Sequence, residues 1–319
     1  MGEKNGERKE IAKAGKKPPL FKSVIALFLW LGMVQFNLGL LVSAFFLPLR
    51  IGILIPALLV LLRLIPINRN SKFGSKVARF IAKNAYGYFP VTVHIEDEKA
   101  FDPDQAYVFG YEPHTIIGLG AWALTDRAGY TPFPRIKFLA SSLAFNIPIM
   151  RHIWTWLGLF PVTRKSFVKQ LSAGNSCIVV PGGMQEMLYL EPDSEVAFLK
   201  SRKGFVKLAI EMGCPLVPVF CFGQNQVYKW WKPKGKISHT LYKAIKYPPV
   251  LSWGRLGSAI PFRVPLNIVI GKPIPLKKNN KPTIEEVNEM HAQFVAAMQE
   301  LFEKNKAQFG SKDLQLRLL

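Results

Sequence analysis

Cysteine and metal-binding patterns are scarce in this sequence. Its 319 residues include three cysteines, Cys177, Cys214 and Cys221, each in apolar surroundings and none in a C-x-x-C pair. The five histidines also lie outside metal-ligand spacing of one another or of a cysteine, and no Asn-x-Ser/Thr sequon occurs. These absences argue against a disulfide framework and a zinc site, and they favour a reducing compartment. We expect no bound metal.

Acidic residues are scarce as well. Lysine and arginine number 42 against 21 aspartates and glutamates, which gives a formal net charge of +21. A surplus of this size requires a partner of opposite sign, which is nucleic acid, an anionic lipid headgroup or a phosphorylated substrate. Composition alone leaves these three open.

Polar residues are nearly missing between positions 24 and 47, where Gln35, Asn37 and Ser43 are the clearly polar side chains. This run is long enough for a bilayer span, which needs roughly 20 residues. An interruption at residues 48–50 precedes a second apolar run, 51–62, which is short for a span. Basic residues flank both ends, so the positive-inside rule predicts a membrane hairpin over residues 23–66, spanning or re-entrant, with cytoplasmic ends. A pair of buried core helices is the alternative.

The rest of the chain has the pattern of an α/β domain. Residues 1–22 are polar and basic, and we expect a disordered tail. Residues 67–319 alternate short apolar runs with amphipathic ones, which predicts one α/β domain. The expected strands are residues 106–111, 136–140, 159–163, 177–180, 216–220 and 266–270, and the expected helices are residues 203–212 and, after a capping box at 283–286, 284–301.

A histidine follows the first of these strands. The apolar segment 107–111 favours a pleated, buried surface, and Pro113 biases Glu112 away from helix. His114 is therefore expected at a strand end, where α/β enzymes often carry catalytic groups, and imidazole exchanges protons near neutral pH. Taken alone, a hydrogen-bonded structural histidine is the commoner outcome.

Two further clusters follow along the chain. At Pro181–Gly183 a buried strand ends in a double glycine, which lets backbone N–H groups approach a ligand closely, and Glu186 comes three residues later. Arg202–Phe205 opens an amphipathic helix, and cations with free N–H groups at a helix start suit a phosphate. Ordinary surface turns explain each cluster when it is taken alone.

In this order and spacing, the clusters resemble the type 2 diacylglycerol acyltransferase family, which includes monoacylglycerol and wax-alcohol acyltransferases. The resemblance covers residues 21–310 and rests on Tyr-Glu-Pro-His at 111–114, Pro-Gly-Gly at 181–183, Arg-Lys-Gly-Phe-Val-Lys-Leu-Ala at 202–209 and the block at 217–228. Animal members usually have a second histidine where this chain has Glu112, so the Glu-Pro-His form resembles the plant and algal branch. Related glycerolipid acyltransferases carry an aspartate where this chain has Leu119, so the acid must come from elsewhere.

The resemblance implies a glycerolipid-acyltransferase-like fold, in which a mixed sheet is flanked by helices and preceded by the membrane hairpin. It implies transfer of a fatty acyl group from acyl-CoA to 1,2-diacylglycerol, without a cofactor, at a cytosol-facing site on the endoplasmic reticulum membrane or on lipid droplets. Monoacylglycerol and long-chain alcohols are alternative acceptors. A non-catalytic membrane scaffold is the alternative of another class, and a homo-oligomer is left open.

In the implied mechanism His114 is the general base that deprotonates the acceptor hydroxyl. Glu186 is the first candidate for orienting the imidazole, and Glu112 is the second. Backbone N–H groups at the double glycine would stabilise the oxyanion, and cations would bind the phosphates of CoA. The candidate substrate contacts are Pro113, Gly182, Gly183, Arg202, Lys203, Gly204, Phe205, Arg164 and Asn225.

Two other patterns have weaker functional interpretations. Residues 118–123 fit G-x-G-x-x-A, but no acidic residue follows near position 140, so we predict close packing behind the histidine loop rather than a dinucleotide site. Residues 228–247 interleave lysines with tryptophan and tyrosine, which suits single-stranded nucleic acid, a lipid headgroup interface or a solvated loop. The hydrophobic hairpin argues against nucleic acid as a partner.

Overall fold

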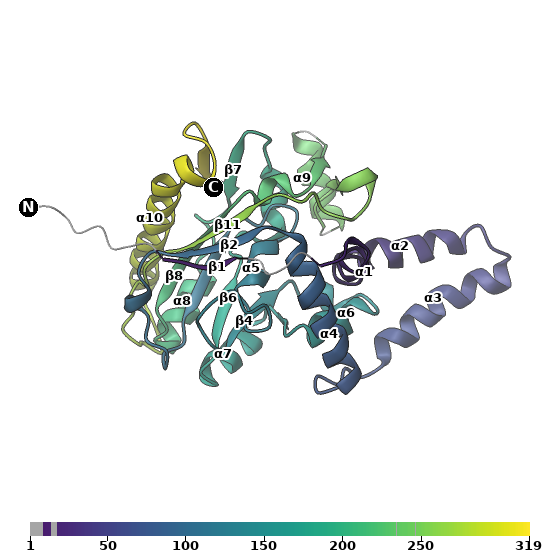
Figure 1. The fold of residues 1–319 in the computed structure, drawn as a ribbon, viewed down its shortest axis with the longest axis horizontal. Helices are drawn as coiled ribbons and strands as arrows, with labels where there is room; N and C mark the ends of the chain where they lie inside the picture. The colour runs from purple at the N-terminus through teal and green to yellow at the C-terminus, as the bar shows by residue number, and fades with distance from the viewer. Residues whose placement is uncertain (1–8, 14–17, 234, 246) are drawn as a thin grey trace, which may run out of the picture.

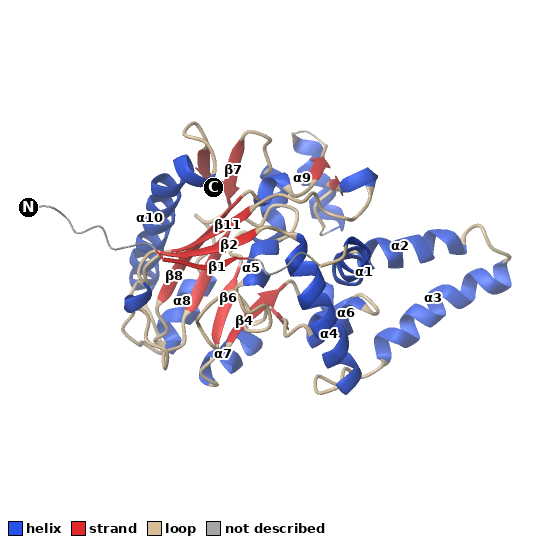
Figure 2. Cartoon of the chain, viewed as in Figure 1, coloured by secondary structure: helices blue, strands red, loops and turns tan. Residues whose placement is uncertain are grey.

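An eight-stranded sheet forms the centre of the fold (Figures 1 and 2). The computed structural model describes residues 9–13, 18–233, 235–245 and 247–319. In sheet order the strands are β1 (Lys9–Lys13), β2 (Val91–Ile95), β11 (Leu266–Ile270), β8 (Leu216–Phe222), β3 (Val108–Glu112), β6 (Ser176–Val179), β4 (Ile136–Ala140) and β5 (Phe160–Pro161). The predicted α/β class and mixed sheet are confirmed.

Five neighbouring strands, β8, β3, β6, β4 and β5, run parallel to one another. At the other side of the sheet, β11 is antiparallel to β8, β2 is parallel to β11, and β1 is antiparallel to β2. The carboxyl ends of parallel strands meet at one edge of a sheet, where ligands of α/β folds commonly bind. The segments that follow β3, β5, β6 and β8 are therefore brought together at this edge.

Helices cover both faces of the sheet, and β8 shows why. It is buried along its whole length, with Val217 and Val219 in one core and Phe220 and Phe222 in the other. A strand that is apolar on both faces needs a helical layer on each side. The first core includes α1 (Leu20–Leu31), α4 (Lys72–Ala85), α5 (Leu119–Ala123) and α6 (Met150–Trp156), and the second includes α7 (Arg164–Ser172), α8 (Gly204–Met212) and α10 (Ile284–Phe309).

Several elements agree closely with the sequence pattern. β4 and β11 have the predicted bounds, and α10 begins at the predicted capping box between Thr283 and Glu286. β5 has two residues, where five were expected. The structure adds two small sheets that the pattern did not indicate, which pair β7 (Ser194–Ala197) with β12 (Gln315–Leu318) and β9 (Lys229–Trp231) with β10 (Leu251–Trp253).

The expectation of a disordered tail over residues 1–22 needs correction. Residues 9–13 form the edge strand β1, paired with β2, and α1 begins at Leu20. β1 pairs through main-chain groups, which a polar composition does not prevent. The remaining part of the expected tail, residues 1–8 and 14–17, lies outside the described residues.

The N-terminal apolar run is not one straight helix, as a simple span would require. α1 and α2 (Met33–Ala44) meet at Gly32 with a bend of 72°. A Cβ at Gly32 would lie 2.7 Å from the Phe28 ring, so the bend depends on a missing side chain. In the described residues no single helix is long and apolar enough to cross a membrane, whereas α1 and α2 together pass on length and composition as a bent pair.

The two halves of the bent pair have different surroundings. Leu27 and Trp30 of α1 are buried against the body of the protein. Beyond Gly32, α2 and α3 (Leu49–Leu64) run out and back as an arm that projects from the body (Figure 1). We call α2, α3 and their connection, residues 33–64, the hairpin arm. Its large exposed apolar side chains include Phe45, Phe46, Leu49, Leu54, Leu58, Leu61 and Leu64.

Polar contacts fix the base of the hairpin arm. The Asn37 side chain in α2 donates to the Pro148 carbonyl at 3.2 Å. The Arg63 guanidinium at the end of α3 donates to the Asn146 side chain at 2.8 Å. Both acceptors belong to the loop that leads into α6, so the arm is attached to the same edge of the body at both ends.

Candidate active site

The sequence-predicted clusters meet at the carboxyl edge of the parallel strands. His114 follows β3, the double glycine follows β6, and Arg164 follows β5. Gln224 comes two residues after β8. Residues separated by more than 100 positions in the chain therefore line one region, because their strands are neighbours in the sheet.

The imidazole of His114 has a defined tautomer. Its Nδ1 lies 2.9 Å from the carbonyl oxygen of Thr115. A carbonyl only accepts hydrogen bonds, so Nδ1 carries a proton, and in the neutral ring the lone pair is on Nε2. Among the described residues Nε2 has no hydrogen-bond partner, and the ring is half-buried in the wall of a cavity. The ring is therefore set up to accept a proton at Nε2.

Glu186 holds the histidine loop by its main chain rather than by the ring. Its Oε1 accepts from the backbone N–H groups of His114 at 2.6 Å and Thr115 at 3.2 Å, and its Oε2 accepts from that of Phe198 at 3.2 Å. The expected carboxylate–imidazole contact is therefore wrong. Glu186 is fully buried in the 3-10 helix η4 (Gly183–Tyr189), and there it satisfies three main-chain donors that would otherwise lack partners.

Glu112 faces Glu186 and not the imidazole. It is fully buried, and its Oε1 accepts from the Gly182 N–H at 3.3 Å. Burial first, and then the charge of Glu186, raise the pKa of Glu112 well above its usual range. Oε2 of Glu112 has no donor among the described residues, and a carboxyl that keeps its proton donates to the neighbouring carboxylate. We therefore treat Glu112 as neutral and hydrogen-bonded to Glu186.

Gln224 fixes the segments on both sides of His114. Its side-chain amide donates to the Pro113 carbonyl. Its Oε1 accepts from the Tyr111 hydroxyl and from the Gly120 N–H at 3.1 Å. Gln224 was not among the sequence-predicted site residues, which included its neighbour Asn225. The Asn225 side chain instead donates to the Glu191 carbonyl at 3.3 Å.

The two glycines after β6 serve packing in this conformation. The N–H of Gly182 donates to Glu112, and that of Gly183 donates to the Val180 carbonyl at 3.1 Å. Both donors are occupied, so the expected oxyanion role has no support. A Cβ on Gly182 would lie 2.3 Å from the Glu186 carboxylate, which explains the need for glycine there. Gly120 is similarly constrained, because a Cβ added there would lie 2.4 Å from the Tyr111 hydroxyl. This agrees with the close packing that the sequence predicts behind the histidine loop.

The cavity that contains His114 is apolar and has a volume of about 330 Å³. Trp122, Trp154 and Met187 contribute to its walls, and Gly183 lies in it. Leu31 and Val34, on either side of the bend that starts the hairpin arm, complete one wall. We call this space the reaction cavity. A chain of methylene groups matches such a lining.

A basic pocket of about 340 Å³ adjoins the reaction cavity, and Val162 and Val180 line both. Arg164, Arg202, Lys203, Gly204 and Phe205 line the basic pocket at the start of α8. Three of these side chains also have protein partners: Arg202 donates to Gln185 at 2.6 Å, Arg164 pairs with Glu211 at 2.7 Å, and Lys203 donates to Asn288 at 2.6 Å. The Phe205 ring is buried and packs on Phe294, so it belongs to the core.

Comparisons with known proteins decide the family. A family model described as diacylglycerol acyltransferase matches residues 43–319. The chain belongs to the diacylglycerol acyltransferase family. The family resemblance and the assignment to an acyltransferase class of enzymes are thereby confirmed.

Individual members of the diacylglycerol acyltransferase family show the extent of the likeness. Diacylglycerol O-acyltransferase 2 of Danio rerio is 35% identical over 249 residues, which are 70% of this chain and 66% of that protein. 2-Acylglycerol O-acyltransferase 3 of Homo sapiens is 35% identical over 251 residues, 73% of each chain. Diacylglycerol O-acyltransferase 1 of Schizosaccharomyces pombe is 34% identical over 239 residues, 70% of this chain and 69% of that protein.

A solved structure gives a looser likeness. The 1-acyl-sn-glycerophosphate acyltransferase PlsC of Thermotoga maritima is 15% identical, with a TM-score of 0.44, over 86% of this chain and 98% of that protein.

Proposed function

We propose that this enzyme transfers a fatty acyl group from acyl-CoA to the free hydroxyl of diacylglycerol and so forms triacylglycerol. The observation that carries the proposal is the position of His114. Its ring, with Nε2 unpaired, lines an apolar cavity that adjoins a pocket of cationic side chains. An acyl thioester with a phosphorylated carrier needs both environments, and it needs them side by side.

In the proposed reaction Nε2 of His114 accepts the proton of the acceptor hydroxyl as its oxygen attacks the thioester carbonyl. The tetrahedral intermediate then expels the thiolate of CoA, which takes up the proton from the imidazolium. The Thr115 carbonyl keeps the ring in the required tautomer, since it holds the proton on Nδ1 throughout. Glu186, protonated Glu112 and Gln224 position the loop and do not touch the reacting atoms.

The basic pocket would bind the phosphates of CoA. Arg202 and Lys203 precede α8, whose first N–H groups also favour an anion. Each cation has a protein partner in this structure, and arginine and lysine have further donors free for a phosphate. Asn225 lies away from both spaces and drops out of the proposed substrate contacts.

The hairpin arm would insert in the cytosolic leaflet of the endoplasmic reticulum membrane or in a lipid-droplet monolayer. Exposed leucines cover both helices of the arm, and the exposed Phe45 and Phe46 lie in their connection; contact of such a surface with water is unfavourable. Because Leu31 and Val34 also line the reaction cavity, diacylglycerol would enter it laterally from the lipid.

An acceptor panel tests the proposal. Purified full-length protein, reconstituted with one labelled acyl-CoA, is offered diacylglycerol, monoacylglycerol and a long-chain alcohol. We expect the highest kcat/KM with diacylglycerol. The likeness to a human 2-acylglycerol O-acyltransferase makes monoacylglycerol the second candidate, and a higher kcat/KM with it would overturn the choice of acceptor. Absence of transfer to all three would favour a membrane scaffold.

A further inference from the structure

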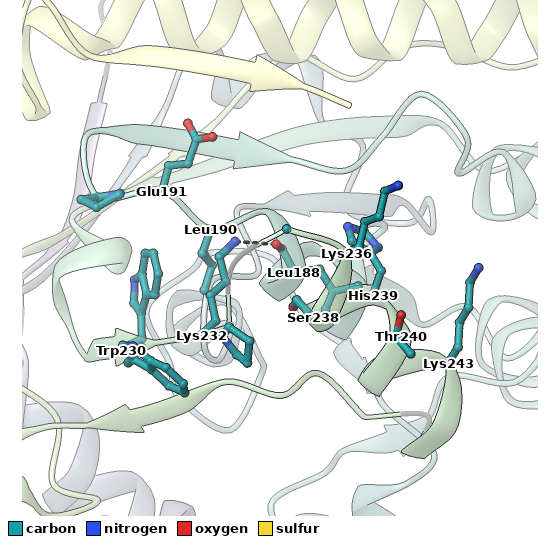
Figure 3. A pocket seen from close by; sticks show the side chains of 14 residues that line it. Leu188, Leu190, Glu191, Trp230, Lys232, Lys236, Ser238, His239, Thr240 and Lys243 are labelled. Atoms are coloured by element: carbon teal, nitrogen blue, oxygen red, sulfur yellow. Dashed lines mark hydrogen bonds between the residues drawn. The ribbon is translucent and has the colours of Figure 1, made fainter.

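A further cavity, of about 1000 Å³, lies outside the reaction site (Figure 3). Its walls come from the chain at and after the end of η4, from β9 and from α9 (Lys236–Ile245). It shares no lining residue with the reaction cavity or the basic pocket. Nothing in the proposed acyl transfer uses it.

The cavity is basic because one face of α9 is basic. Lys236, His239 and Lys243 stand at positions i, i+3 and i+7 of the helix, so they share a face. Figure 3 shows the two lysines projecting from α9 on the same side. Neither lysine has an ion-pair partner in the described part of the chain. The carboxylate in the wall, Glu191, is already paired with Arg317.

Two polar groups on the wall have unused hydrogen-bonding capacity. Ser238 is 3% exposed, and its hydroxyl has no partner among the described residues. A buried hydroxyl without a partner is costly, so a polar group in the cavity would satisfy a donor that the described residues leave unpaired. Lys232 donates to the Leu188 carbonyl, drawn as a dashed line in Figure 3, and its ammonium keeps two further donors.

The other walls of the cavity are apolar. Leu188, Leu190, Trp230 and Trp231 line it, and Trp231 is 57% exposed. A small inorganic anion would leave these groups without contacts. A ligand with a phosphate and an apolar portion satisfies both kinds of wall.

The surroundings of α9 place the cavity near lipid. Ile237, Leu241 and Ile245, at i, i+4 and i+8, form an exposed apolar stripe on another face of the helix. Tyr247, just beyond α9, lines the reaction cavity together with Val34 of the hairpin arm. The carboxyl end of α9 therefore lies near the base of the arm.

We propose that this cavity binds an acidic phospholipid, with the lysines of α9 as ligands of the phosphate, the Ser238 hydroxyl, on another face of the helix, as a donor to an ester oxygen, and the tryptophans against the start of the acyl chains. The site is separate from the acceptor and acyl-CoA sites. It shares η4 with the reaction cavity, since Gly183, Met184 and Met187 line one space and Leu188 lines the other. A phospholipid bound in this cavity would therefore affect the position of η4, which carries Glu186.

Binding of short-chain phosphatidic acid to the detergent-solubilised full chain, measured by calorimetry, tests this proposal. We expect saturable binding that the Lys236→Gln/Lys243→Gln pair weakens about 25-fold, at about fivefold for each charge removed near a phosphate. Ser238→Ala should weaken it at least threefold. Both lysines are exposed, so their replacement does not disturb packing. The matched control is Lys277→Gln/Lys281→Gln, two exposed lysines outside the cavities described above.

The comparison ligands are phosphatidylcholine of the same chain length, CoA and inorganic phosphate. The proposal requires that phosphatidylcholine and inorganic phosphate bind at least tenfold more weakly than phosphatidic acid. CoA has its own proposed site in the basic pocket, so for CoA the requirement is that Lys236→Gln/Lys243→Gln leave its binding within about twofold of the parent. An equal loss in the control pair would show that only net charge matters, and it would overturn the assignment. Equal binding of inorganic phosphate, or a loss of CoA binding in the lysine pair as large as that of phosphatidic acid, would show a phosphate site without lipid specificity and would also overturn it. Because acyl transfer is not the readout, a failure here leaves the proposed reaction untouched.

Discussion

At His114 a main-chain carbonyl, and not a carboxylate, selects the nitrogen that can accept a proton. The contact between Nδ1 and Thr115 is local, so it forms wherever the loop has this conformation. The loop in turn depends on Glu186, which accepts from the N–H groups of residues 114 and 115, and on Gln224. Glu186 thus acts on the backbone of the histidine segment and not on the ring.

Glu112 provides a test of this arrangement, because its raised pKa makes it a proton donor to Glu186. Glu112→Gln keeps a donor at the same place, so we expect acyl transfer within about threefold of the parent. Glu112→Ala leaves Glu186 and the Gly182 N–H without their partner, which typically costs about 1–3 kcal/mol, so we expect the rate of acyl transfer to fall by about 5- to 150-fold. Acyl-transfer rates of the parent and the two variants, measured in the same detergent, check both expectations. Equal inactivity of the two variants would contradict a neutral Glu112.

The raised pKa of Glu112 also predicts a pH dependence of stability, which a comparison of the parent with Glu112→Gln reveals. A carboxyl whose folded pKa is raised contributes stability that is fully present below its unfolded pKa, about 4.3, and is lost as pH rises through the folded value. Gln does not titrate. Urea unfolding from pH 5 to pH 9 should therefore show the Gln variant gaining stability over the parent as pH rises, with little difference near pH 5. The reverse trend would mean that Glu112 is ionised in the folded state.

The sequence identified the right residues more reliably than their contacts. His114, Glu112, Glu186 and the double glycine do meet, because each follows or ends a strand of one parallel array. The hydrogen bonds between these residues depend on the directions of their side chains in the turns. The spacing of residues in the sequence does not predict these directions. The difference between Gln224 and Asn225 shows this, since both stand in the same motif block and only Gln224 turns toward the loop.

At the scale of elements, local signals gave good boundaries and long-range pairing did not. A buried apolar run correctly predicted β11, and a capping box correctly predicted the start of α10. β7 and β12 are four residues each and exist because they pair across more than 100 positions, which leaves no local pattern. The bend at Gly32 also depends on long-range contacts, because α1 packs against the body of the protein. The local sequence pattern therefore did not predict it.

The hairpin arm carries its own prediction. Leu54 and Leu58 in α3 are 63% and 55% exposed, so Leu54→Lys/Leu58→Lys should leave the fold intact. A lysine in the hydrocarbon core costs about 2.5–3.5 kcal/mol, so the pair should shift the protein out of the membrane fraction after carbonate extraction. The control is Ile284→Lys, which is 74% exposed at the start of α10, outside the arm. Equal retention of the variant and the control would contradict insertion of the arm.

At the scale of the whole molecule, the distribution of charge follows the proposed substrates. The acids nearest the site, Glu112 and Glu186, are buried under the histidine loop. Cations line the basic pocket and one face of α9, and they contribute to the net charge of +21. An apolar cavity open to the hairpin arm on one side and a basic pocket on the other would let a lipid acceptor and a phosphorylated donor approach from opposite directions.

The most direct test of the central claim is the rate of acyl transfer by His114→Ala in liposomes with acyl-CoA and diacylglycerol. Loss of a general base typically lowers the rate about 10²–10⁴-fold, and we predict a loss in this range with membrane binding unchanged. His152→Ala, a half-buried histidine of α6 that lines none of the three cavities, should retain the parental rate. Full turnover by the His114 variant would contradict the account.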